Sequence, residues 1–398
     1  MTRASSERLK SALANPLEWL LGAQAASFLT DSYEQKPVVV RHDDPDRFSD
    51  LLSIAEIDHT VAEFDLQRGM LVMTDAARRI EESEFVAPSG AIDRSAVAGL
   101  YQGGATLILN QLQQSNGAMA ALCGSLERVF SCHVQTNTYL TPPSSQGFRT
   151  HYDNHDVFVI QLEGEKAWRL HDQPVAAPYR GEQFEPDAYP VGDLSESFVL
   201  RAGDCAYVPR GLMHDAATSG DQPSLHITCG LIVRTWADLV LEAVSEVCVK
   251  DPAFRRSLPP GFARPDFDRG RLAGDFEALM QRLSEKARPD SALDLAVREF
   301  IASRESDVSG ALVGAHAPIA PSYVARPSIW RIEEDQIDGA PALRLLAPGG
   351  DLTFTTISRD GLERVLSGRP FAPADLGADS TGLVRRLVSA GLITATSA

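Results

Sequence analysis

Hydrophobic and polar residues change their spacing twice along the 398-residue chain. Residues 1 to about 130 mix helical spacing, as in NPLEWLLG and GAMAALCGSLERVF, with short strand-like runs such as KPVVVRH and ATLILNQL. From about 131 to 235 short strands follow one another between Gly, Pro and Asp turns: HVQTNTYLT, DVFVIQLEG, KAWRLH, ESFVLRAGDCAYVPRG and LHITCGLIV. This spacing predicts a β-sandwich or barrel preceded by a helical cover.

After Thr235 the helical spacing returns in WADLVLEAVSEVCVK, DFEALMQRLSEKA and ALDLAVREFIASR, so three helices are expected. The Pro- and Gly-rich stretch GAHAPIAPSYVARP predicts a domain boundary near residue 325. Beyond it, strand-like ALRLLAP and LTFTT precede helix-like RDGLERVLSG and STGLVRRLVSAGLI, the order of a small winged-helix-type module. The expected domains are therefore residues 1–235, 236–324 and 325–398.

The net charge of the chain indicates which kind of molecule it could bind. The net charge of −17 disfavours nucleic acid, because phosphate contacts need a cationic face, and the last helix-like stretch has only Arg385 and Arg386 as cations. Packing or protein contact is the better interpretation of that helix. A basic protein or peptide suits the acidic chain, and GEQFEPDAYPVGDLSES (residues 181–197) could steer it.

The expected compartment is the cytoplasm. Five cysteines form no CxxC pair, which favours reduced thiols over a disulfide framework or a structural zinc site. The first residues have an amphipathic, charged character without a long apolar run, so neither a signal peptide nor a membrane association is expected.

The stretch THYDNHDVFVIQLEGEKAWRLH, residues 150–171, begins with polar side chains at metal-ligand spacing. Residues two apart in a strand share a face, so His151 and Asp153 can bind one ion. His214 is the expected third ligand, because it follows a turn and a strand in GDCAYVPRGLMHDA, where a cupin-like barrel has its distal ligand. Two histidines and one carboxylate form the facial ligand set of non-haem Fe(II) oxygenases.

Four further side chains need an interpretation. His155 shares the strand parity of the pair but lies further along, so a direct role is not favoured. His226, in SLHITCG, is expected to be a core histidine, with support of the metal ligands as the alternative, and His171 is expected to be exposed. Lys166 is flanked by apolar residues, which predicts an anionic partner such as a carboxylate of 2-oxoglutarate; a surface lysine at the tip of the EGEK hairpin is equally compatible.

These motifs resemble the JmjC-type ribosomal oxygenases, also called the cupin-4 family. The resemblance rests on NTYLTPPSSQGFRTHYDNHDVFVIQLEGEKAWRLH, GDCAYVPRGLMHDA and SLHITCGL, and on the order of the regions along the chain. It implies a mixed α and β fold, with a double-stranded β-helix (cupin/JmjC) barrel, a helical dimerisation region and a C-terminal winged helix. A homodimer is part of the same expectation.

The resemblance also implies roles for particular residues. Fe(II) would be held by His151, Asp153 and His214. The cosubstrate 2-oxoglutarate would be gripped by Lys166, with Asn137 and Tyr139 lining the same pocket. Trp168, Phe158 and Phe148 could keep the site dry, or could be plain core and rim packing.

Family members hydroxylate histidine or arginine side chains of ribosomal proteins. Lysine at position 166 together with YLTPP is more similar to the histidine-hydroxylating branch. Two other functions stay open at this point. The chain could hydroxylate a non-ribosomal peptide or a biosynthetic precursor, or it could be a non-catalytic cupin-type binding protein.

Overall fold

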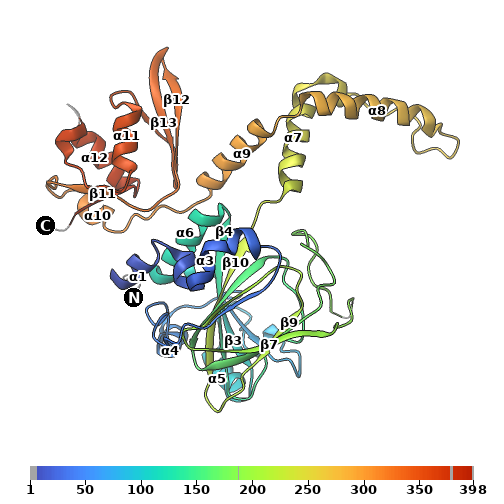
Figure 1. Ribbon diagram of the computed structural model, residues 1–398, viewed down its shortest axis with the longest axis vertical. Coiled ribbons are helices and arrows are strands. Elements are labelled where there is room, and N and C mark those ends of the chain that lie inside the picture. Colours follow the sequence, from blue (N-terminus) through green and yellow to red (C-terminus); the bar gives the residue numbers. More distant parts are fainter. Residues whose placement is uncertain (1–6, 187, 377–379, 397–398) are drawn as a thin grey trace. The chain divides into compact units, whose positions relative to one another are not determined.

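The computed structural model describes residues 7–186, 188–376 and 380–396 of the chain (Figure 1). These residues form two compact units, which divide between Val233 and Arg234. Within the described part of the chain, no helix is both long and apolar enough to cross a membrane.

The helices of the first unit mostly precede its long strands. In chain order they are α1 (Glu7–Ala12), α2 (Pro16–Leu21), η1 (Gly22–Gln24), α3 (Ala25–Asp31), α4 (Ile54–Glu63), η2 (Glu82–Glu84), α5 (Arg94–Gln102), η3 (Leu112–Gln114) and α6 (Gly117–Phe130). Helix α6 begins where the side chain of Asn116 accepts hydrogen bonds from the N–H groups of Ala118 and Met119. Its buried face, which includes Leu122 and Leu126, belongs to the main hydrophobic core. The helical cover expected from the sequence is confirmed at these positions.

The strands of the first unit form two antiparallel sheets. They are β1 (Val38–Val40), β2 (Leu71–Thr74), β3 (Thr106–Asn110), β4 (His133–Thr141), β5 (Asp156–Glu163), β6 (Glu165–His171), β7 (Leu194–Arg201), β8 (Cys205–Val208), β9 (His214–Ala217) and β10 (Ser224–Ile232). The larger sheet has the order β1-β8-β5-β10-β4-β3-β2, and the smaller has the order β7-β6-β9. Gly164 alone joins β5 to β6, at a φ of 65° and so close to the Pro223 carbonyl oxygen that a Cβ would lie 2.1 Å from it. Only glycine fits this turn, which sends the chain from one sheet to the other.

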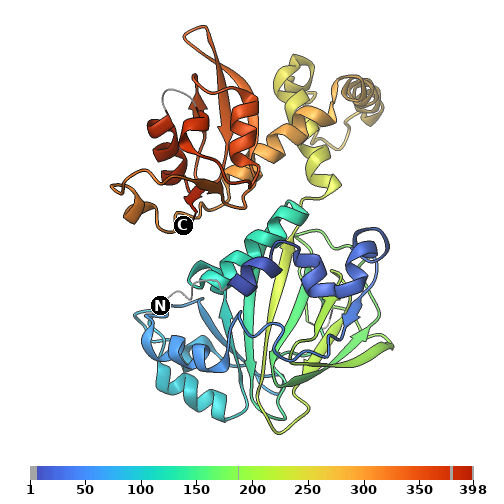
Figure 2. The same cartoon turned by 60° about the vertical axis from the view of Figure 1, so that its left-hand side comes forward.

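Strand β5 is buried on both faces, and its alternate residues belong to different cores. Val157 and Val159 pack in a cluster with Trp168 of β6. Phe158 faces the opposite side, where it is fully buried in the core beneath the helices and its ring contacts Phe28. Figure 2 shows these helices covering one face of the larger sheet. Phe158 is therefore a core residue, as one of its two interpretations expected, and the suggestion that it helps to keep the site dry is wrong.

The second unit begins with the three helices expected from the sequence. They are α7 (Trp236–Lys250), α8 (Arg269–Lys286) and α9 (Pro289–Ala302), with the short helix η4 (Pro252–Arg255) between the first two. Helix α7 starts in a capping box, in which the side chains of Thr235 and Asp238 each accept the other residue's backbone N–H. Helices α7 and α9 pack against each other, and Arg298 of α9 pairs with Glu333 at 2.7 Å.

The last part of the second unit mixes strands and helices around its own core. Its elements are α10 (Ala311–Gly314), β11 (Tyr323–Ala325), β12 (Arg331–Ile337), β13 (Ala340–Leu346), β14 (Leu352–Phe354), α11 (Arg359–Leu366), η5 (Pro373–Leu376), α12 (Ser380–Ser389) and β15 (Ile393–Ala395). Arg385 and Arg386 lie on α12. Arg385 donates to the Ala315 carbonyl, and Arg386 lies over the ring of Phe354 at 4.7 Å. Both cations thus make contacts within the module, which favours the packing interpretation of this helix.

Candidate metal centre

Two histidines far apart in the chain are neighbours across a single β-bridge. The N–H of His151 donates to the carbonyl of His214 at 3.0 Å, and the N–H of His214 donates back at 2.7 Å. Their ring centroids are 4.7 Å apart, and Asp153 contributes a carboxylate oxygen 3.7 Å from His214 Nε2. Ligand atoms of all three residues lie within 4.8 Å of one another. The structure therefore brings together the three residues expected to bind a metal.

Both imidazoles are oriented by backbone carbonyls. His151 Nδ1 lies 2.9 Å from the Arg149 carbonyl, and His214 Nδ1 lies 3.0 Å from the Leu212 carbonyl. A carbonyl oxygen only accepts, so Nδ1 is the donor in each of these contacts, and in the neutral form of each ring Nε2 is the nitrogen with a free lone pair. This is the usual arrangement of metal-binding histidines, whose second nitrogen is held by a hydrogen bond.

The electrostatics of the cluster favour the ligating protonation states. Burial, and then the nearby His151, lower the pKa of His214. Burial alone would raise the pKa of Asp153, but His151, His214 and His155 hold it below its ordinary value. A neutral imidazole beside an ionised carboxylate is the state that binds a divalent cation.

Lys166 lies inside the fold and not at a hairpin tip. Its side chain starts from β6, is 4% exposed, and donates to the Thr141 hydroxyl at 3.0 Å. Burial lowers the pKa of Lys166 to about 7. The surface-lysine interpretation is therefore wrong, and the buried amine has no ion-pair partner among the described side chains. A buried amine of this kind can hold a small anion.

An aromatic wall lies beside this lysine. Tyr139 of β4 and His226 of β10 face each other across the strand pair, with stacked rings 4.7 Å apart. Trp168 packs edge-on against His226, with ring centroids 5.7 Å apart, and also lies 5.9 Å from His214. Burial, and then Lys166, place the pKa of His226 well below its ordinary value, so the ring is neutral. His226 is thus buried as expected, but it borders the proposed pocket.

Two buried nitrogens of this wall make no hydrogen bond to described protein atoms, namely His226 Nδ1 and Trp168 Nε1. Buried polar atoms in native proteins are nearly always paired, so such atoms mark a place for a polar ligand or for water. The wall, the lysine and the triad together fit a polar small molecule bound beside a metal.

The two remaining predicted pocket residues lie on the same face of β4. The Tyr139 hydroxyl is hydrogen-bonded to Asn137 and Thr228, and burial, followed by Asp153, raises its pKa to about 12. Asn137 also accepts a hydrogen bond from the Gln111 N–H at 3.3 Å. Thr141, which sequence reasoning missed, shares this face and is the partner of Lys166; the alternation along NTYLT could have identified it.

The predictions for three further residues near the triad, His155, His171 and Phe148, can be compared with their positions in the structure. His155 is outside the set of mutually close ligand atoms, and its ring packs on the backbone of Gly230. His171 was expected to be exposed; this is wrong, since its side chain is 11% exposed and its Nε2 lies 3.2 Å from Asp215. Phe148 is 39% exposed, with its ring 5.4 Å from that of His151, so it lies at the rim.

The acidic stretch 181–197 approaches the triad. The ring of Phe184 lies 6.3 Å from that of His151 and 5.3 Å from that of Tyr152. Asp187, one of the carboxylates that could steer a basic partner, lies outside the described residues.

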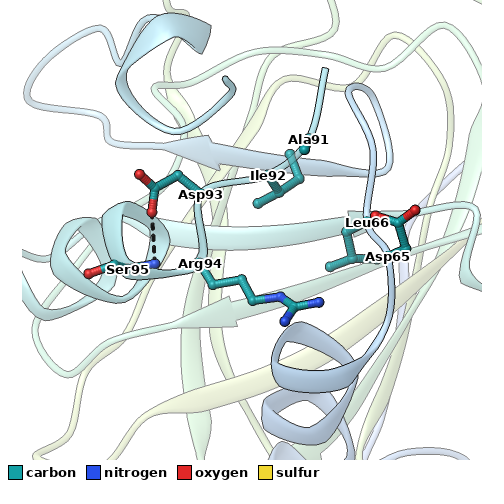
Figure 3. A pocket seen from close by; sticks show the side chains of 7 residues that line it. All are labelled: Asp65, Leu66, Ala91, Ile92, Asp93, Arg94 and Ser95. Atoms are coloured by element: carbon teal, nitrogen blue, oxygen red, sulfur yellow. Dashed lines mark hydrogen bonds between the residues drawn. The ribbon is translucent and has the colours of Figure 1, made fainter. Parts of the chain in front are cut away.

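A surface pocket of about 440 Å³ lies elsewhere in the first unit, at the start of α5 (Figure 3). Asp93 caps that helix by accepting the N–H of Ser95, and Arg94 extends along the pocket wall. The pocket contains none of the six predicted site residues. This pocket is therefore separate from the triad and from the residues expected to hold the cosubstrate.

Comparisons with known proteins agree on one family. Residues 109–239 match the JmjC domain. Ribosomal oxygenase 1 of Danio rerio is 31% identical over 303 residues, which are 71% of this chain and 55% of that protein. Bifunctional lysine-specific demethylase and histidyl-hydroxylase NO66 of Drosophila yakuba is 34% identical over 252 residues, 61% of this chain and 37% of that protein. The chain spans about half the length, or less, of these relatives.

Solved structures show the same fold at lower identity. An X-ray structure of E. coli ycfD matches with a TM-score of 0.55 and 14% identity, covering 94% of this chain and 98% of that one. A structure of YcfD described as a ribosomal oxygenase in complex with cobalt and 2-oxoglutarate matches with a TM-score of 0.53 and the same identity, covering 94% of this chain and 99% of that one.

Proposed function

This chain carries a JmjC domain and belongs to the JmjC-type ribosomal oxygenases, and from that premise we propose that it is an Fe(II)- and 2-oxoglutarate-dependent protein hydroxylase. Its substrate in this proposal is a ribosomal protein, with a histidine side chain favoured and an arginine possible. One observation carries the proposal: His151, Asp153 and His214 place ligand atoms within 4.8 Å of one another, and the buried Lys166 lies on β6, the strand that pairs with the strand of His214.

The residues present fit the metal and the cosubstrate. Two imidazole Nε2 atoms and one carboxylate are the donors of the facial set, which leaves coordination positions open for other ligands. With 2-oxoglutarate and molecular oxygen, iron in such a site supplies oxidative decarboxylation to succinate, coupled to insertion of one oxygen atom into a C–H bond.

The protein's own part is to bind, orient and exclude water. The Lys166 ammonium, held by Thr141, would pair with the distal carboxylate of the cosubstrate, and Tyr139 and Asn137 would line the same pocket. Neutral His226 and the indole of Trp168 each have a buried nitrogen without a partner among the described protein atoms, which the cosubstrate or water would use. Phe148 at the rim would shield the reacting centre from solvent.

The architecture we propose follows from the same family. The two antiparallel sheets of the first unit would form the double-stranded β-helix barrel, and residues 325–398 would form the winged-helix module. Helices in residues 236–324 would form a homodimer interface. Exposed apolar side chains on α7 support the interface: Trp236 is 81% exposed, Val240 57% and Leu241 60%. A cytoplasmic location completes the proposal, supported by a sequence whose five cysteines include no CxxC pair.

Histidine is favoured as the target because a histidyl-hydroxylase is among the relatives and position 166 is a lysine. The proposal is tested by intact-mass measurement of ribosomal proteins from cells with and without the gene, together with succinate release by the purified protein. A mass increase of one oxygen atom on one ribosomal protein is expected. Succinate release without any ribosomal target would indicate a hydroxylase of another peptide, and no iron-dependent turnover would indicate a binding protein.

A further inference from the structure

A second polar cluster is centred on the residue that follows His214. Asp215 is in strand β9, and its side chain is 2% exposed. Its carboxylate accepts hydrogen bonds from the Thr150 hydroxyl at 2.9 Å and from Arg169 Nε at 2.8 Å, and it lies 3.2 Å from His171 Nε2. Three separate side chains thus converge on one buried carboxylate.

The three side chains that contact Asp215 come from strand β6 and from the segment that carries His151. Arg169 and His171 lie on β6, the strand next to β9 and the one that also carries Lys166. Thr150 precedes His151 in a segment joined to β9 at that point by one isolated β-bridge. Thr150 precedes His151 in the chain and Asp215 follows His214. The side chains of Thr150 and Asp215 are therefore hydrogen-bonded to each other directly beside the two histidines.

We propose that Asp215 is a positioning residue for the metal ligands, acting through the hydroxyl of Thr150. The inference rests on the proposed metal-binding function. By accepting the Thr150 hydrogen bond, Asp215 fixes the segment that carries His151 and Asp153 against the strand that carries His214. Its contacts with Arg169 and His171 hold the carboxylate itself in place, since a buried carboxylate needs donors on both oxygens.

The physical need for such a residue follows from the local structure. The His151–His214 bridge supplies two backbone hydrogen bonds, and the Gly211 N–H donates to the Asp153 carbonyl at 2.9 Å, but these backbone contacts are isolated and do not continue as a ladder along the segment. A metal centre requires its donor atoms at set distances, and groups that orient ligands typically contribute about 10- to 100-fold to metal affinity. The hydrogen bond from Thr150 to Asp215 adds a side-chain contact between the segment of His151 and Asp153 and the strand of His214, beside these backbone bonds.

The test compares two substitutions at Thr150, one that removes the hydroxyl group and one that keeps it. Thr150→Val removes the hydroxyl and keeps the shape, whereas Thr150→Ser keeps the hydroxyl. Thr136→Val is a matched control, because the Thr136 hydroxyl also donates a hydrogen bond, to Gln113 at 2.9 Å. Thr136 lies on the face of β4 opposite to the one that carries Asn137 and Tyr139. The purified full chain is titrated with Co(II), binding is followed by the visible absorption of the bound ion, and Tm is measured for each variant.

We expect Thr150→Val to weaken Co(II) binding about tenfold and to change the absorption spectrum, with Thr150→Ser and Thr136→Val close to wild type. Asp215→Asn, which keeps an acceptor oxygen but loses the charge that holds Arg169, should fall between them. If Thr150→Val binds Co(II) as wild type does, or if its loss is matched by Thr136→Val at equal Tm, the positioning role is overturned while the proposed function stands. A wild-type protein that binds no Co(II) would overturn the proposed function, and this inference with it.

Discussion

Lys166→Met is the sharpest test of the cosubstrate pocket, because methionine keeps the apolar stem and removes only the amine. Lys166 is 4% exposed and donates to the Thr141 hydroxyl at 3.0 Å. A charge-assisted bond to a carboxylate contributes about 1.5–3 kcal/mol, so the substitution should weaken 2-oxoglutarate binding on the order of tenfold to a hundredfold. The folded protein should not lose stability through the missing charge, since burial already disfavours the ammonium.

The same lysine predicts a pH dependence with a definite sign. In the free protein burial lowers the pKa of Lys166 to about 7, so above pH 7 the amine is mostly neutral. A bound carboxylate favours the ammonium, and binding above pH 7 must then take up a proton. Affinity for 2-oxoglutarate should fall by up to about tenfold for each pH unit between 7 and 9. His226 stays neutral over this range, because its pKa lies well below its ordinary value.

Isothermal titration calorimetry of 2-oxoglutarate into the Co(II)-loaded protein measures both effects. Titrations at pH 7, 8 and 9, in buffers of different ionisation enthalpy, report the affinity and the number of protons taken up. Lys166→Met should show weak binding with little dependence on pH. Unchanged affinity in that variant, or wild-type binding that takes up no proton above pH 7, would refute the assignment of the carboxylate to Lys166.

Three further predictions concern the ligands, the interface and the partner. His214→Ala should abolish Fe(II) binding and turnover with the circular dichroism spectrum unchanged, and normal iron binding in that variant would show that the ligand assignment is wrong. Light scattering at micromolar concentration should give a dimer mass, and Leu241→Glu, on the exposed face of α7, should give a monomer; a monomeric wild type would contradict the dimer. Affinity for a basic ribosomal peptide should fall as salt rises past about 0.15 M, where the Debye length is roughly 8 Å, and binding that ignores salt would exclude electrostatic steering by this acidic chain.

The sequence by itself determined the element types and three of the side chains that meet at the centre. Alternation in HVQTNTYLT, the short continuous apolar run in DVFVIQLEG and helical spacing in GAMAALCGSLERVF each match an element of the structure, because these patterns follow from backbone geometry and burial. The spacing pairs His151 and Asp153 as neighbours on one face of a strand; the pairing agrees with the structure, but the strand premise is wrong, because His151 makes only an isolated bridge and β5 begins at Asp156. His214 needed the turn and strand that precede it.

Tertiary structure decided which faces meet, because period-2 alternation separates two faces of a strand without saying which one borders a ligand. It placed Phe158 beneath the helices and left Trp168 beside His214. It also turned Lys166 inward to Thr141, a choice that the EGEK hairpin left open.

The contacts of His171 and Asp215 could not be deduced from the chain, since they join strands 44 residues apart whose register only the folded sheet fixes. Residues that bind the metal are recognisable by chemical type and spacing. Those that hold the ligands in place are ordinary polar residues, and they become visible only when folding removes them from water and gives each a partner.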